Sequence, residues 1–225
     1  MVQRPENIAS IINGVERYNP EHIDALESYL NQQCENNQYD CEVNLAILKL
    51  YQFNPQLAKE HVIAKILIKA LIALPAPDFN LCLYLLAEQA HLESVQKLTE
   101  LQQLLEQARY AKFWQSDLTP WTNVVPNFET KIRQVIAQVI AMSYQTVNVS
   151  ALSGYLGLNG DEFDKFCASQ QWQKNGNIVQ IPINKDNEAK TVVIRENIKF
   201  EQLTKVIGYS NEIRIVAFET RKPDP

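Results

Sequence analysis

Apolar side chains recur every third or fourth position through most of residues 6–145, which is the period of an amphipathic α-helix. Prolines fall between these runs and not inside them, as expected where one helix ends before the next begins. The pattern predicts helices over Glu21–Glu35, Cys41–Phe53, His61–Leu74, Leu81–Ala90, Glu93–Arg109 and Phe128–Tyr144. Their succession, without a repeated consensus motif, predicts an irregular solenoid of stacked helices.

The run Cys41–Phe53 differs from the others because it is apolar nearly all round. Glu42, Lys49 and Gln52 form only a narrow polar stripe along it. Neighbouring helices must therefore cover most of its circumference. We expect this helix to be the centre of the core.

Basic side chains gather on one edge of the next run. His61, Lys65 and Lys69 recur every four residues and so share one side of the helix, which we expect to face solvent or a partner. Scattered bases such as Lys65, Lys69, Arg195 and Lys199 leave direct contact with RNA open. The competing interpretation is that such a stripe is only a solvated face.

The pattern changes after Gln145, where glycines and β-branched clusters replace the helical period. The elements expected there are helices at Ser150–Leu156 and Asp161–Gln170, strands at Ile178–Ile181 and Thr191–Ile194, and a helix near Phe200–Ile207. Two helices followed by a two-stranded wing predict a winged helix. The fold class is therefore mainly α, with a helical-repeat (HEAT/TPR-like) domain at residues 1–145, a winged-helix domain with a small antiparallel wing at 146–210, and a tail at 211–225.

The wing is the main candidate for a partner-binding site. Both predicted strands are apolar on both faces, and a short two-stranded sheet has edges that need covering. One face can pack on the domain's own helices, which leaves the rest for another chain, through an added strand or through packing. The candidate partner-binding residues are Ile178, Val179, Ile181, Val192, Val193 and Ile194.

The second helix of the winged helix argues against DNA binding. It opens Asp161-Glu162-Phe163-Asp164, with carboxylates where contacts to phosphates and bases would need basic or amide side chains. These acids complement the positive end of the helix dipole instead. We therefore expect no DNA partner.

Composition places the chain among ordinary globular proteins, with 46% hydrophobic and 21% charged residues and a net charge of −5. No apolar stretch reaches the roughly 20 residues that a membrane span requires, so we expect no membrane partner. The first residues contain no apolar secretion segment, which favours a cytoplasmic location. A reducing cytosol would keep the four cysteines as thiols.

Catalytic and metal-binding patterns are not evident. Cys34 and Cys41 are too far apart for a paired zinc motif, and the histidines lie on separate predicted helices. Gly154, Gly157 and Gly160 have the spacing of turn formers and lack the lysine of a phosphate loop. We expect no catalytic, metal or cofactor residues, and the chain is predicted not to be an enzyme.

Three stretches carry a resemblance to a known family. Residues 14–21 (Gly-Val-Glu-Arg-Tyr-Asn-Pro-Glu), Tyr39-Asp40 and residues 44–55 (Asn-Leu-Ala-Ile-Leu-Lys-Leu-Tyr-Gln-Phe-Asn-Pro) resemble the subunit k family of eukaryotic translation initiation factor 3. The similarity continues more loosely through Phe113-Trp114-Gln115 and covers roughly residues 10–208.

This resemblance implies a PCI-type architecture and a role in protein biosynthesis. Family members are non-catalytic scaffold subunits, and subunit k pairs with subunit l in a factor that binds the small ribosomal subunit and supports recruitment of mRNA and initiator tRNA. Two alternatives stay open: a PCI-type scaffold subunit of the proteasome lid or signalosome, and a winged-helix nucleic-acid-binding regulator. The last alternative predicts a basic recognition surface, which the acidic helix does not supply.

Overall fold

The computed structural model describes residues 4–86, 89–189, 199 and 201–209. Residues Met1–Glu188 form one compact unit and Ala189–Pro225 a second. In the second unit, residues 201–209 form a helix, which overlaps the predicted Phe200–Ile207. The predicted strand Thr191–Ile194 lies outside the described residues. The boundary expected near residue 146 stays a prediction.

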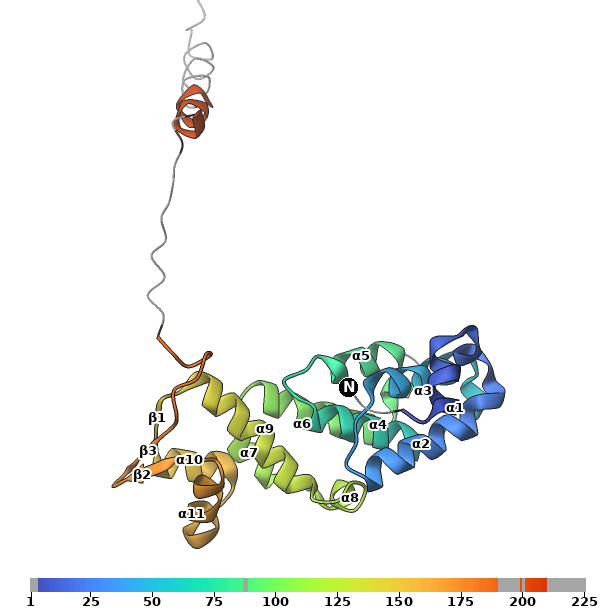
Figure 1. The fold of residues 1–225 in the computed structure, drawn as a ribbon, viewed down its shortest axis with the longest axis horizontal. Helices are drawn as coiled ribbons and strands as arrows, with labels where there is room; N and C mark the ends of the chain where they lie inside the picture. The colour runs from blue at the N-terminus through green and yellow to red at the C-terminus, as the bar shows by residue number, and fades with distance from the viewer. Residues whose placement is uncertain (1–3, 87–88, 190–198, 200, 210–225) are drawn as a thin grey trace, which may run out of the picture. The chain divides into compact units, whose positions relative to one another are not determined.

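The first unit is a succession of helices followed by a small sheet and two more helices (Figure 1). Its longer helices are α1 (Glu6–Asn13), α2 (Ile23–Glu35), α3 (Cys41–Phe53), α4 (Glu60–Ile72), α5 (Asp78–Leu85), α6 (Glu93–Glu106), α9 (Phe128–Ser143), α10 (Val149–Leu156) and α11 (Gly160–Ser169). Shorter helices are η1 (Val15–Tyr18), η2 (Pro20–His22), η3 (Pro55–Leu57), η4 (Gln89–His91), α7 (Tyr110–Gln115) and α8 (Thr119–Thr122). The strands are β1 (Thr146–Asn148), β2 (Gln173–Asn175) and β3 (Ile178–Gln180). A mainly helical fold with a small antiparallel sheet is thus confirmed.

Helix α4 is more deeply buried than α3, which the sequence had placed at the centre of the core. It packs against α2, α5, α6 and α9, and nine of its residues are buried compared with six in α3. The predicted exposed edge of α4 holds only in part. His61 is exposed and Lys65 is half-buried. Lys69 is only 4% exposed, because the last turn of α4 lies under the end of α2. Lys69 is therefore wrong as a candidate for rRNA contact.

A buried polar network joins α2 to the start of α3. Gln33 donates from Nε2 to Asn44 Oδ1 (3.0 Å) and accepts from the backbone N–H of Asp40 (2.8 Å). Asp40 caps α3 by accepting from Val43 N–H (3.3 Å), which satisfies one of the free donors of that helix end. The network fixes where α3 begins.

Arg4 ties the start of the chain to this network. Its Nε donates to Asp40 Oδ2 (2.5 Å), and its Nη2 donates to Asp40 Oδ1 (2.9 Å) and Glu42 Oε2 (2.6 Å). The side chain of Asp40 is 3% exposed and that of Glu42 is 57% exposed. The pairing with Asp40 should therefore contribute more to stability than the pairing with Glu42.

We expect Asp40→Ala to lower the free energy of unfolding by about 3 kcal/mol, because it removes the cap of α3 and the buried partner of Arg4. The matched change Glu42→Gln, at the exposed partner of the same arginine, should cost less than about 0.5 kcal/mol. Urea unfolding followed by circular dichroism measures both. Equal losses would show that the burial of Asp40 is not what makes it important.

The sheet has the order β1-β3-β2 with both pairs antiparallel. Strands β2 and β3 form a hairpin around Gly176, whose φ of +61° suits the first central position of a two-residue turn. Val147 on β1 lies opposite Val179 on β3, and both are buried. The described partners of the predicted strand at Ile178–Ile181 are thus β1 and β2, neither of which the sequence had predicted.

Candidate functional site

The predicted wing residues have different environments. Val179 is 0% exposed and Ile181 is 4% exposed, so both belong to the core of the chain's own winged helix. Ile178 is 48% exposed and accessible to a partner. Val192, Val193 and Ile194 lie outside the described residues. The partner-binding role of this set stays a prediction, and among its described members Ile178 is the accessible one.

Strand β3 is central, since β1 and β2 pair with its two edges. An added strand would therefore have to pair with β1 or β2, and not with Ile178–Gln180. Beside β3 lies a hollow of about 270 Å³ lined by Gln171, Gln173, Gln180, Ile181, Pro182 and Ile183. Ile183 is 70% exposed, so this end of the unit presents a second apolar side chain besides Ile178.

The segment after β3 turns back onto the end of α9. Asn184 Nδ2 and Asn187 Nδ2 both donate to Ala141 O, at 2.8 and 3.0 Å, and Asn187 Nδ2 also lies 3.2 Å from Tyr144 O. These carbonyls stand at the end of a helix, where they lack partners within it. The two asparagines thereby anchor the segment that follows Ile183 to the end of α9.

Helix α11 carries the acidic residues that argued against DNA binding. Asp161, Glu162 and Asp164 are exposed, while Phe163 between them is buried. Asp164 pairs with Lys174 of β2 (Nζ to Oδ1, 2.7 Å), which neutralises one base of the wing. Asp161 and Glu162 form no ion pair within the described residues, so the first turn of α11, which a DNA-binding winged helix would turn to the duplex, is negative.

Trp114 of α7 and Arg133 of α9 connect the preceding helices to α10 of the winged helix. Trp114 Nε1–H donates to Tyr155 O (2.8 Å) and Arg133 Nε–H to Leu156 O (3.1 Å), so both satisfy carbonyls in the last turn of α10. The guanidinium of Arg133 lies 4.7 Å from the centre of the Trp114 ring. Gly157 follows with a φ of +60°, and a Cβ there would lie 2.9 Å from Trp114 Cγ. The glycine lets α10 end directly against the indole.

Comparison with known proteins connects this architecture to a family. The model of the CSN8/PSMD8/EIF3K family matches residues 57–193, which include the helices from α4 to α11 and all three strands. The chain belongs to the CSN8/PSMD8/EIF3K family. Its PCI-type helical fold is the one that the sequence predicted.

Curated relatives within this family are similar along nearly their whole length. Eukaryotic translation initiation factor 3 subunit K of Botryotinia fuckeliana is 43% identical over 232 residues, which cover 93% of this chain and 95% of the relative. The proteins of the same name from Phaeosphaeria nodorum and Neurospora crassa are 42% and 41% identical, over 93% of this chain. The predicted relation to subunit k of initiation factor 3 is confirmed.

The thiols of this CSN8/PSMD8/EIF3K family member have raised pKa values. Burial raises the pKa of Cys41 to about 11 and that of Cys82 to about 12, so at neutral pH both are thiols and not reactive thiolates. Burial and the hydrogen bond to Asp78 (2.8 Å) raise the pKa of Tyr39. Within the described residues, no group of three or more His, Cys, Asp or Glu could hold a metal ion. No helix in this part of the chain is long and apolar enough to cross a membrane.

Proposed function

We propose that this chain is a non-catalytic scaffold subunit of eukaryotic translation initiation factor 3. In this proposal it docks on subunit l and supports recruitment of mRNA and initiator tRNA to the small ribosomal subunit in the cytoplasm. The observation that carries the proposal is the 41–43% identity, over 93% of the chain, with proteins named subunit K of that factor. The negative face of α11 and the raised thiol pKa values fit a role in binding proteins better than a role in binding DNA or in thiol chemistry.

The winged-helix end is the proposed docking surface for subunit l. Ile178 and Ile183 expose apolar surface there, beside a hollow lined mostly by glutamines and apolar side chains. Apolar side chains surrounded by polar ones are typical of the centre of a protein interface. Val192, Val193 and Ile194 are proposed to extend this surface.

We expect Ile178→Asp to weaken the complex with subunit l at least about tenfold, because it places a carboxylate in an apolar contact. Co-expression followed by size-exclusion chromatography at micromolar concentrations measures the complex. Position 178 is the right one to change, since a charge at the fully buried Val179 would unfold the winged helix instead.

The matched control is Tyr84→Asp, on α5 in the helical layers, where the side chain is 78% exposed. It should leave the complex intact. If the unmodified chain and subunit l elute separately, the pairing with subunit l is wrong. If they elute together and Ile178→Asp has no effect, the pairing holds and its assignment to the wing is wrong.

The family description supports a second candidate, a scaffold subunit of the proteasome lid or signalosome, because the matched model covers those subunits as well. Copurification from cells separates the two candidates. Initiation factor subunits in the purified complex support the first, and lid or signalosome subunits support the second.

A further inference from the structure

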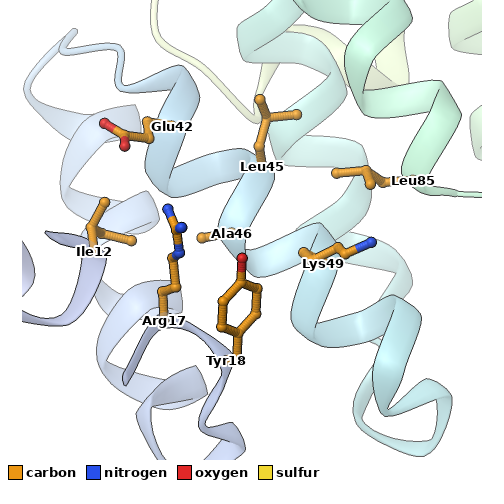
Figure 2. A pocket seen from close by; sticks show the side chains of 8 residues that line it. All are labelled: Ile12, Arg17, Tyr18, Glu42, Leu45, Ala46, Lys49 and Leu85. Carbon is orange, nitrogen blue, oxygen red and sulfur yellow. The ribbon is translucent and has the colours of Figure 1, made fainter. Parts of the chain in front are cut away.

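An open groove lies among α1, η1, α3 and α5, which are elements that the proposed function does not use. It has a volume of about 260 Å³ and is lined by Ile12, Arg17, Tyr18, Glu42, Leu45, Ala46, Lys49 and Leu85. In Figure 2, Arg17 and Tyr18 rise from η1 on one side, α3 carries Leu45, Ala46 and Lys49 through the middle, and Leu85 of α5 closes the other side. Apolar side chains thus line the base of the groove and cations stand beside it.

Exposed aromatic rings continue the groove at one end. Tyr18 is 47% exposed and Phe53 is 58% exposed, and their ring centres lie 6.3 Å apart at an interplanar angle of 59°. Arg17 Cζ lies 5.1 Å from the Tyr18 ring centre, and Lys49 Nζ lies 4.8 Å from that of Phe53. The rings hold both cations at the rim.

Around the groove, the carboxylates have ion-pair partners, but two of the cations do not. Glu42 pairs with Arg4 (2.6 Å), and Glu16 pairs with His22 (3.0 Å), so both nearby carboxylates have partners. Arg17 and Lys49 have no carboxylate partner within the described parts of the chain, and Lys49 donates only to Gln52 Oε1 (2.8 Å). On a chain of net charge −5, this groove therefore offers two unpaired positive charges beside apolar surface.

We propose that the groove binds an extended acidic segment of a partner protein. One bulky apolar side chain of the segment occupies the space between Tyr18 and Leu85, and flanking carboxylates pair with Arg17 and Lys49. The volume suits a single side chain, because sites for whole small molecules usually exceed about 300 Å³. The ion pairs at the rim would set the orientation of the bound segment and the rate at which it meets the groove. The apolar contact would supply most of the affinity.

Single-stranded RNA fits this groove less well. Its bases need flat stacking faces, whereas the rings of Tyr18 and Phe53 are tilted to each other by 59°. The chain's own residues 211–225 also fit less well, because they carry three acids and three bases and so lack the complementary charge.

The test uses the full chain and the fluorescein-labelled peptide Gly-Asp-Glu-Leu-Phe-Glu-Asp-Gly, with binding followed by fluorescence anisotropy. We expect saturable binding that weakens as salt is raised. The double change Arg17→Gln with Lys49→Gln should lower the affinity about tenfold or more. Ala46→Phe, which fills the groove and keeps both charges, should do the same.

The matched control is Lys112→Gln with Lys165→Gln, which removes two exposed cations that form no ion pair within the described residues and should change the affinity less than about twofold. Circular dichroism confirms that each variant is folded. The proposal is overturned if the peptide fails to bind at about 1 mM, or if the groove variants bind like the unmodified chain. It is also overturned if oligouridylate or a peptide of residues 211–225 binds more tightly. None of these outcomes bears on docking of subunit l at the wing.

Discussion

Gly157→Ala is expected to lower the free energy of unfolding by about 3 kcal/mol, although it adds only one methyl group. Part of the cost is the left-handed backbone, because a side chain at a φ of +60° loses about 1 kcal/mol relative to glycine. The rest is a steric clash, since the new Cβ would lie 2.9 Å from Trp114 Cγ. The indole cannot move aside without breaking its bond to Tyr155 O and its contact with Arg133.

Two controls separate these contributions in urea unfolding. Gly176→Ala, at a φ of +61° with open space around it, should cost only about 1 kcal/mol. In a chain that already carries Trp114→Ala, Gly157→Ala should also lower the free energy of unfolding by only about 1 kcal/mol. The coupling energy between positions 114 and 157 is then about 2 kcal/mol. If Gly157→Ala and Gly176→Ala cost the same, Trp114 is not what requires a glycine at position 157.

The helices that periodicity predicted best are those with a clear signal at both ends. Helix α3 was predicted with its observed bounds, and the structure shows Asp40 as its N-cap and Pro55 just beyond its end. Helix α9 was predicted to within one residue at its end. In both, the local signals and the tertiary packing agree, which is the condition under which sequence suffices.

The elements that the sequence did not predict are short or polar. Helix α1 carries Ile8, Ile11 and Ile12 on one face, but its 8 residues give too few turns for a reliable period. Strand β2 reads Gln-Lys-Asn and is exposed throughout, so it has no alternation of apolar and polar residues. Its one signal was Gly176-Asn177, a pair typical of a two-residue hairpin.

The candidate wing site shows the limit of an apolar pattern. The sequence identified an apolar strand at Ile178–Ile181 but could not tell which of its faces is covered, because that depends on β1, α10 and α11. Val179 and Ile181 proved to be core residues, and Ile178 proved to be accessible. The groove beside α3 had a partial signal, since Glu42 and Lys49 were recognised as a polar stripe. Its other side comes from η1, whose position no local pattern gives.

The sequence also misplaced Lys69, because a local pattern does not show that the end of α2 covers this side chain. The burial of Lys69 leads to the second prediction of a large change in stability. The ammonium group donates to Gln33 O at the end of α2 (3.2 Å), an oxygen that already accepts from Gln38 N–H (3.1 Å). The pKa of Lys69 is lowered from 10.5 to about 8, mainly by burial, with Cys34 opposing the change and nearby Lys131 adding to it. The folded chain thus holds a poorly compensated positive charge.

We expect Lys69→Met to raise the free energy of unfolding by about 2 kcal/mol at neutral pH, because it removes this charge, keeps the apolar stem and leaves Gln33 O with a partner. The gain should depend on pH. Below about pH 8 the lysine is charged in both states, so the folded state bears the full cost of burial. Between about pH 8 and 10.5 the folded lysine is neutral while the unfolded one still binds a proton, so the unmodified chain recovers stability as the pH rises.

Urea unfolding of both chains across this range measures the difference, in which contributions from other groups that titrate at high pH, such as the buried tyrosines, largely cancel. The advantage of Lys69→Met should be greatest near pH 7 and shrink toward pH 10. The control Lys65→Met lies one turn earlier on α4, where the amine bonds Asn31 Oδ1 at the surface (2.8 Å), and should change stability by less than about 0.5 kcal/mol. A Lys69→Met chain that is less stable, or whose advantage does not vary with pH, would mean that the carbonyl of Gln33 and the dipole of α2 compensate the ammonium fully. Lys69 would then be a stabilising cap of α2 and not a buried cost.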